Sequence, residues 1–190
     1  QVWKPRELNT HETEWGFSCM SYEISGALGI KMANPEKEVV SFVGDGSYLL
    51  FNSDIYSSVI TNNKLIIIVC DNGGHAVINR LQLNKGGKEF NCLFNSSKAS
   101  NLVPVDFASH AKSMGANGEQ VNSISELEEA FKRAKKSKKT YVISIHTDGY
   151  QWLEGSAYWE SPTLSLPSTE ENKRSLKEHL EGKNKQRKGV

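Results

Sequence analysis

Cysteine is scarce in this sequence, and neither sign of charge dominates. Three cysteines occur among 190 residues, and Cys19, Cys70 and Cys92 have the spacing of neither a zinc site nor a disulfide framework. The 23 Lys and Arg residues nearly balance the 22 Asp and Glu residues, so the net charge gives no long-range attraction to nucleic acid or to a membrane. The odd, unpatterned cysteines favour a protein of the reducing cytoplasm.

Long apolar runs and internal repeats are also missing. No run is long enough to span a bilayer, and the start has no apolar segment of the secretory kind. The length of 190 residues suits a single domain with a buried core. The first residue is Gln1 rather than methionine, and the chain opens in the middle of a pattern. We interpret it as a part of a longer protein.

The stretch from Val39 to Val77 organises the chain. An apolar run, VVSFV, ends at Gly44, and a second run, LIIIVC, ends at Asp71, with a segment of helix length between them. Two buried strands joined by a helix form a βαβ unit. Since such crossovers are right-handed and make the strands parallel, both strand ends point to the same edge of the sheet.

Asp45 and Asn72 follow directly on the two predicted strand ends. Neighbouring strands lie about 4.8 Å apart, so both side chains could reach one ion. A carboxylate and an amide oxygen are hard ligands that suit Mg²⁺. The pattern therefore predicts a magnesium site at this edge.

The glycines around Asp45 add a place for an anion. Gly44 and Gly46 allow a sharp turn and a close approach of a ligand to the backbone. Gly46 and Ser47 offer backbone N–H groups at the start of the following helix, where an anion is favoured. A lone GDG is usually an ordinary turn, whereas GDG with DN after the next strand indicates a Mg²⁺–diphosphate site.

The pattern resembles the signature of thiamine-diphosphate-dependent enzymes, in which GDG is followed about one βαβ unit later by an Asn-containing turn. Three further segments, EWGFSCMSYEI, INRLQL and TDGY, resemble the trihydroxycyclohexane-1,2-dione hydrolases of myo-inositol catabolism. The resemblance covers most of residues 1–150. It implies a diphosphate-binding domain with thiamine diphosphate and Mg²⁺ as cofactors.

The resemblance also implies roles for particular residues. The Ser18 carbonyl and the Met20 N–H would contact the aminopyrimidine, and Met20 would lie beneath the cofactor and keep it bent. The alternative for Met20 is a plain core residue. The implied cofactor-binding residues are Ser18, Cys19, Met20, Gly44, Gly46, Ser47, Asn72, Gly74, His75, Ala76 and Val77, and the implied metal ligands are Asp45, Asn72 and Gly74.

His75 is the candidate catalytic residue. It follows the implied ligand Gly74, and a histidine there could shuttle protons near neutral pH. The alternative is a loop histidine that hydrogen-bonds only to the backbone or to phosphate. The other histidines, which have no metal spacing and are expected to be structural or exposed, are His11, His110, His146 and His179.

The implied activity is hydrolytic ring opening of a trihydroxylated cyclohexane-1,2-dione by C–C cleavage, in a cytoplasmic homo-oligomer that binds neither nucleic acid nor a membrane. In the family, a glutamate from an N-terminal pyrimidine-binding domain of the same or a partner chain activates the cofactor. That domain is not in this sequence, so the chain alone is expected to be inactive. The alternatives are an acetolactate synthase-like domain, a 2-oxoacid decarboxylase domain and a non-catalytic cofactor-binding module.

The remaining pattern predicts an α/β fold, a mostly parallel sheet with helices on both faces. Residues 1–150 would form the thiamine-diphosphate-binding domain, and residues 151–190 a partly irregular C-terminal extension. Residues 84–100 would form a loop that covers the cofactor. The other expected elements are helices over residues 20–33, 78–83 and 106–114, a helix opened by a capping box at Ser125, strands over residues 120–122 and 140–147, and a short helix around SLKEHL.

Overall fold

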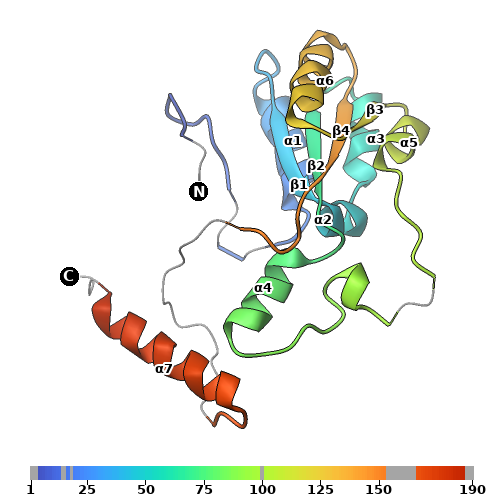
Figure 1. Ribbon diagram of the computed structural model, residues 1–190. Helices are drawn as coiled ribbons and strands as arrows, with labels where there is room; N and C mark the ends of the chain where they lie inside the picture. The colour runs from blue at the N-terminus through green and yellow to red at the C-terminus, as the bar shows by residue number, and fades with distance from the viewer. Residues whose placement is uncertain (1–3, 14–15, 18, 99–100, 153–165, 187–190) are drawn as a thin grey trace. The chain divides into compact units, whose positions relative to one another are not determined.

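The computed structural model describes residues 4–13, 16–17, 19–98, 101–152 and 166–186. The chain divides into two compact units, which we call the sheet unit and the turn unit. The sheet unit comprises residues 1–71 and 104–146, and the turn unit comprises residues 72–103 and 147–190. Figure 1 labels the elements of both.

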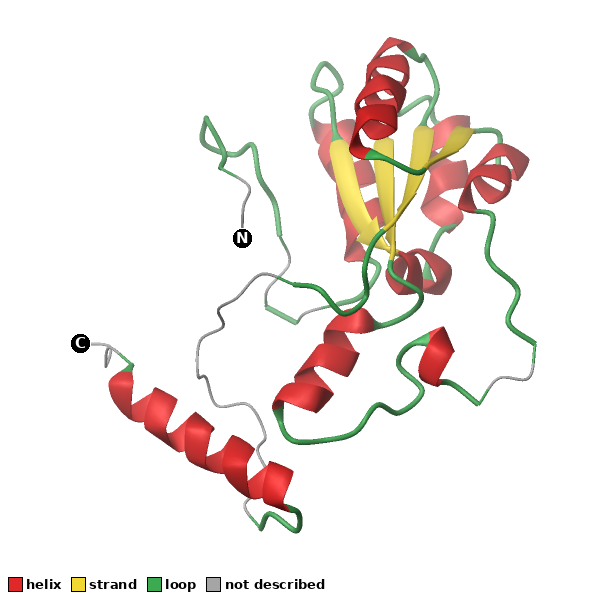
Figure 2. Ribbon diagram, viewed as in Figure 1, coloured by secondary structure: helices red, strands yellow, loops and turns green. Residues whose placement is uncertain are grey.

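The sheet unit contains four parallel strands in the order β1-β2-β4-β3. Figure 2 shows the strands side by side between helices. Central strands buried on both faces need continuous apolar runs, and β2 and β4 have them, whereas β1 at the edge alternates. The strands are β1 (Val40–Gly44), β2 (Ile66–Asp71), β3 (Asn117–Val121) and β4 (Tyr141–His146).

Helices cover both faces of this sheet. One face packs against α1 (Tyr22–Ala33), α2 (Asp45–Leu50), α3 (Ser53–Ile60) and α5 (Phe107–Ser113), and the other packs against α6 (Ile124–Lys136). The two faces form separate apolar clusters, one around Ile67 and Val69 and the other around Ile66 and Ile68. The predicted parallel α/β fold is confirmed.

The expected single helix between β1 and β2 is wrong, because the structure has α2 and α3 there. Phe51 adopts an extended conformation after α2. The Asn52 side chain donates to the Tyr48 carbonyl over 3.1 Å, and its own carbonyl accepts from the Ile55 N–H over 3.0 Å. An Asn that bonds the backbone in this way competes with helix continuation, so the crossover breaks into two helices.

Two other predicted boundaries are corrected. The capping residue of α6 is Ser123 rather than Ser125: its hydroxyl accepts from the Glu126 N–H over 3.2 Å, and Glu126 accepts from the Asn122 N–H over 2.8 Å. The strand expected at residues 120–122 begins earlier, at Asn117, where apolar alternation is weak.

The turn unit contains α4 (Ala76–Asn84), the short 3₁₀ helix η1 (Phe94–Ser96) and α7 (Glu170–Lys185). The predicted short helix around SLKEHL is therefore a longer one. Asn172 donates to the Gly86 carbonyl over 2.8 Å, and Ser175 donates to the Asn84 carbonyl over 2.8 Å. These bonds satisfy carbonyls at the end of α4, which have no partner within that helix. The predicted division at Tyr150 stays a prediction.

Within the described residues, no helix combines the length and apolar character that crossing a bilayer requires.

Candidate functional site

The carboxyl ends of β1 and β2 lie at one edge of the sheet. The two strands pair in parallel, and Gly44 lies opposite Cys70 in the register. Asp45 therefore begins α2 beside the end of β2, and Asn72 is the residue that follows β2. The prediction that both strands end at the same edge is confirmed.

Asp45 is a buried carboxyl group, with 1% of the residue exposed. Burial raises the pKa of the neighbouring Cys70 thiol, and the negative charge of Asp45 raises it further. Asp45 thus brings negative charge to the place where β2 ends. Away from bulk water the effective dielectric constant is lower, so the electrostatic attraction between this carboxylate and a cation is stronger.

The backbone beside Asp45 leaves room for a ligand. A side chain built at Gly44 would meet nothing within 4 Å, so open space adjoins this end of β1. Gly46 and Ser47 lie in the first turn of α2. Space next to backbone N–H groups is the arrangement that a phosphate requires.

α2 is anchored by its own residue Tyr48, which is fully buried. Its hydroxyl oxygen lies 2.9 Å from Nδ1 of His110, and its ring meets that of Phe107 edge-on, with 5.1 Å between centroids. Burial raises the pKa of the Tyr48 hydroxyl far above its ordinary value. The turn at Asp45 therefore rests on a packed, uncharged support.

The turn before α1 meets the Gly44–Ser47 turn. Ser21 is buried and left-handed, with φ 73°, and its hydroxyl donates to the Ser47 carbonyl over 2.6 Å. A non-glycine residue in this conformation stores strain that tertiary contacts must offset, and such residues cluster at functional sites. Ser21 has no recognisable signal in the sequence.

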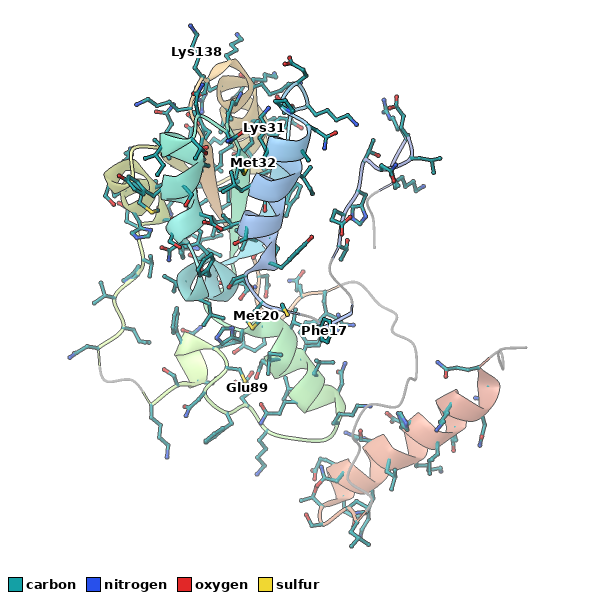
Figure 3. All side chains as sticks on the ribbon, turned by 180° about the vertical axis from the view of Figure 1, so that it is seen from behind. Phe17, Met20, Lys31, Met32, Glu89 and Lys138 are labelled. Carbon is teal, nitrogen blue, oxygen red and sulfur yellow. The ribbon has the colours of Figure 1, made fainter. Side chains whose placement is uncertain are left out.

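The hydrogen bond of Ser21 brings the turn at Met20 next to the Gly44–Ser47 turn. Cys19 is exposed, and Met20 is 45% exposed. Figure 3 shows Met20 near the N-terminal end of α1, and Lys31 and Met32 at the other end of this helix. The interpretation of Met20 as a core residue is therefore wrong. Its role beneath the cofactor stays a prediction, and Ser18 lies outside the described residues.

The turn after β2 has a different construction. Gly73 and Gly74 have φ values of 77° and 138°, which favour glycine. The His75 N–H donates to the Cys92 carbonyl over 2.7 Å, and the Phe94 N–H donates to the Gly73 carbonyl over 2.9 Å. These bonds flank an antiparallel bridge between Gly74 and Leu93. The Asn72–His75 turn is thereby paired with a distant segment.

The last implied residues lie at the start of α4. The His75 side chain is exposed at the position that precedes the helix, Ala76 opens the helix, and Val77 is 65% exposed. The catalytic role of His75 stays a prediction, as do the cofactor contacts of Ala76 and Val77.

A further polar pair at the sheet edge escaped the sequence analysis. Asp71 and His146 end neighbouring strands in register, and Oδ2 of Asp71 lies 3.0 Å from Nδ1 of His146. The opposite ring nitrogen of His146 lies 3.3 Å from the amide nitrogen of Gln120. The pair joins the ends of β2, β4 and β3 beside the candidate site. Its signal was present, because both residues directly end apolar runs.

The donor set fits Mg²⁺ better than a softer metal. Among the described residues, no three His, Cys, Asp or Glu side chains form a group that could bind a metal. The candidate ligands are instead one carboxylate, one amide oxygen and one backbone carbonyl, from Asp45, Asn72 and Gly74. Mg²⁺ commonly takes one or two carboxylates and completes its shell with phosphate oxygens and water. The open space at Gly44 suits the phosphates.

Comparisons with known proteins show the family of this chain. Residues 1–145 match the family described as "Thiamine pyrophosphate enzyme, C-terminal TPP binding domain". A relative from Shouchella clausii (strain KSM-K16), named 3D-(3,5/4)-trihydroxycyclohexane-1,2-dione hydrolase, is 39% identical over 83% of this chain and 26% of its own length. A protein of the same name from Clostridium botulinum (strain Eklund 17B / Type B) is 36% identical over 93% of this chain and 30% of its own.

The fold has a solved counterpart. A thiamine diphosphate-dependent 4-hydroxybenzoylformate decarboxylase of Rhodococcus jostii RHA1 superposes with a TM-score of 0.59, at 23% identity, over 70% of this chain and 24% of that one. The chain spans about a quarter of the curated relatives that it matches. With its Gly-Asp-Gly turn at the carboxyl edge of a parallel sheet, the chain belongs to the thiamine pyrophosphate enzymes, through their C-terminal cofactor-binding domain.

Proposed function

We propose that this chain binds Mg²⁺ and the diphosphate of thiamine diphosphate at the carboxyl edge of its sheet, for a hydrolase that opens the ring of 3D-trihydroxycyclohexane-1,2-dione. The observation that carries the proposal is the parallel pairing of β1 with β2, with Gly44 opposite Cys70. This pairing puts the Asp45 turn beside the strand that Asn72 follows.

Each turn has its own task in this proposal. Asp45, the Asn72 side chain and the Gly74 carbonyl bind Mg²⁺, and the N–H groups of Gly46 and Ser47 donate to the diphosphate. The turn at Met20 receives the pyrimidine. Bound thiamine diphosphate supplies an electron sink for breaking a C–C bond next to a carbonyl.

The substrate is proposed from the names of the relatives. Cleavage of one ring C–C bond, with addition of one water, converts the cyclic dione into an open-chain deoxy-uronic acid. The exposed His75 side chain is the proposed proton carrier for this hydrolysis. The alternative activities, carboligation and 2-oxoacid decarboxylation, would use the same cofactor with different substrates.

Other segments must complete this site. The carboxylate that activates the cofactor is proposed to come from an N-terminal pyrimidine-binding domain of the same or a partner chain, within a homo-oligomer. We place the protein in the cytoplasm, because three cysteines without the spacing of a disulfide framework suit a reducing compartment.

The metal site is tested with Asp45→Ala. Removal of the buried carboxylate should abolish Mg²⁺-dependent binding of thiamine diphosphate, measured by calorimetric titration. Asp54→Ala is the matched control, since Asp54 also lies in the first turn of a helix, α3, but is not a candidate ligand. Equal binding by Asp45→Ala and the unmodified chain would contradict the metal assignment.

The activity is tested with the dione as substrate. We expect no ring opening by the 190-residue chain with Mg²⁺ and thiamine diphosphate, and turnover when a separately made N-terminal domain is added. Turnover by the chain alone would contradict the need for a second domain, and His75→Ala would then be the first variant to assay. Turnover of pyruvate in place of the dione by the mixture would favour the carboligase or decarboxylase alternative. Tight cofactor binding without turnover of any substrate would indicate a binding module.

A further inference from the structure

Gly149 lies against the backbone of the Asn72–His75 turn. A Cβ atom at Gly149 would lie 2.8 Å from the Asn72 carbonyl oxygen, closer than real Cβ atoms approach. The backbone conformation of Gly149 is open to any residue, because its φ lies outside the left-handed range. Glycine is therefore required at this position for space rather than for conformation.

The opposite side of the same turn is just as closely packed. A Cβ atom at Gly74 would lie 2.5 Å from the Cys92 carbonyl oxygen and 3.1 Å from the Cα atom of Leu93. The hydrogen bonds of His75 and of Phe94 to this stretch are 2.7 and 2.9 Å long. The turn therefore has no room to move toward residues 92–94.

Leu93 connects the two sides. Its residue is 2% exposed, and its Cδ2 atom lies 3.6 Å from the Cβ position at Gly149. Ala76, the first residue of α4, has its own Cβ atom 3.7 Å from that position. The turn, the start of α4 and residues 147–150 thus share one packed contact around the Leu93 side chain.

We propose that Gly149 and Leu93 are positioning residues that clamp the backbone of the Asn72–His75 turn from two sides. The clamp fixes the side-chain oxygen of Asn72 and the carbonyl oxygen of Gly74 at the spacing that Mg²⁺ requires. The proposal rests on the metal site of the proposed function. Mg²⁺ demands nearly ideal octahedral geometry at about 2.0–2.1 Å, whereas Ca²⁺ accepts about 2.3–2.6 Å and irregular shells. A clamp that prevents displacement of the turn therefore favours the smaller ion.

Gly149→Ala is the direct test. The methyl group must push the Asn72 carbonyl away, so Mg²⁺ affinity in the presence of thiamine diphosphate should fall about 10- to 100-fold, the usual effect of losing an outer support of a metal ligand. Ca²⁺ affinity should fall less, so the ratio of Mg²⁺ to Ca²⁺ affinity should decrease. Calorimetric titration of both ions measures this ratio, which a general loss of stability would leave unchanged.

Two glycine variants are matched controls. Gly29→Ala adds a methyl group in α1 that meets nothing within 4 Å. Gly118→Ala adds one that collides with the Ala108 carbonyl oxygen, the same kind of contact in the sheet unit. Gly118→Ala should lower the unfolding midpoint without changing the preference for Mg²⁺ over Ca²⁺.

A second measurement does not depend on the cofactor. In Gly149→Ala the amide protons of His75 and Phe94 should exchange faster with solvent, because displacement of the turn weakens their hydrogen bonds. Leu93→Ala is the second variant, for the case that Gly149→Ala fails to fold. It leaves Gly149 in place and should shift exchange and ion preference in the same direction.

The outcomes separate the two proposals. If the unmodified chain binds Mg²⁺ and thiamine diphosphate, and both variants keep the unmodified ion preference and amide protection, the clamp is overturned and the metal site stands. If the unmodified chain binds neither, the proposed metal site fails, and the role of Gly149 toward the metal fails with it. A lower Mg²⁺ preference in Gly149→Ala, with Gly118→Ala unchanged, supports the clamp.

Discussion

The turns that follow β1 and β2 are supported in different ways. The turn at Gly44 is supported by buried side chains of the sheet unit. Val43, Asp45 and Tyr48 are each at most 2% exposed, and they belong to the strand before the turn and the helix after it. This support comes with the packing of the sheet.

The turn at Asn72 depends on backbone contacts instead. Cys92 and Phe94 bond its backbone, and Gly149 allows the chain to pass close to the Asn72 carbonyl. These contacts join backbone to backbone, in segments without hydrophobic periodicity. We therefore expect the Gly44 turn to be as stable as the sheet, and the Asn72 turn to be only as stable as its loop contacts.

The two turns should therefore open under different conditions. Regions with few buried apolar contacts open locally at a lower free energy than a core does. We expect the Asn72 turn to open without unfolding of the sheet, whereas the Gly44 turn should open only with it.

Ile67→Ala should give the largest loss of stability. Ile67 is fully buried in the cluster beneath α1 and α3, and such a truncation costs about 2–5 kcal/mol of unfolding free energy. Urea denaturation followed by circular dichroism measures the loss. Ile60→Ala is the control, since Ile60 is 62% exposed on α3 and should change stability by less than about 0.5 kcal/mol. Equal losses in the two variants would contradict the assignment of the core.

Gly74→Ala should have a smaller and local effect. Alanine at φ 138° is strained, and its Cβ atom would also meet the Cys92 carbonyl. Gly73→Ala is the matched variant, because Gly73 has φ 77° but open space around its Cβ position, so that it bears only about 1–2 kcal/mol of left-handed strain.

Hydrogen exchange distinguishes the two variants. Gly74→Ala should abolish protection of the His75 amide, and Gly73→Ala should retain most of it. The amides of β2 should stay protected in both variants. Loss of protection in β2 together with His75 would show that the turn and the sheet open as one unit, and the contrast between the two turns would be wrong.

The sheet and the edge that carries the candidate ligands could be predicted because both depend on short patterns in the sequence. The strands are continuous apolar runs that end at GDG and DN, and parallel pairing then brings the two ends together. The predicted capping residue of α6, Ser125, was wrong because Ser123 with Glu126 and Ser125 with Glu128 both fit the capping-box spacing, so that spacing alone does not distinguish them.

The supports of the site lie beyond such patterns. The hydroxyl of Ser21 donates to the Ser47 carbonyl, 26 residues away. Gly149 lies against the Asn72 carbonyl, although residues 104–146 of the sheet unit come between them in the sequence. Neither contact has a local signature, because each depends on where two backbones pass in the folded chain. Sequence reasoning located the candidate ligands, whereas the residues that position them became visible only in the structure.

Glu119 should give the smallest effect, and one that depends on pH. It lies on β3, at the sheet edge away from β1. Its carboxylate accepts from the Tyr141 hydroxyl over 2.7 Å and from Nη2 of Arg133 over 2.8 Å. Partial burial alone would raise the pKa of Glu119, but these hydrogen bonds and the charge of Arg133 together hold it below the ordinary value of 4.5.

The direction of this shift sets the pH range of the prediction. A carboxyl group with a lowered pKa in the folded state stabilises the fold above its unfolded-state pKa, and this contribution disappears as the pH falls through the folded-state pKa. The unfolding free energy of Glu119→Gln should therefore lie slightly below that of the unmodified chain at pH values above 4.5. The two values should converge under more acidic conditions. Glu36→Gln, at an exposed turn residue, is the control. A deficit of Glu119→Gln that persists into acid would show that its amide disturbs packing, and a deficit as large as that of Ile67→Ala would mean that polar contacts at the sheet edge matter as much as the core.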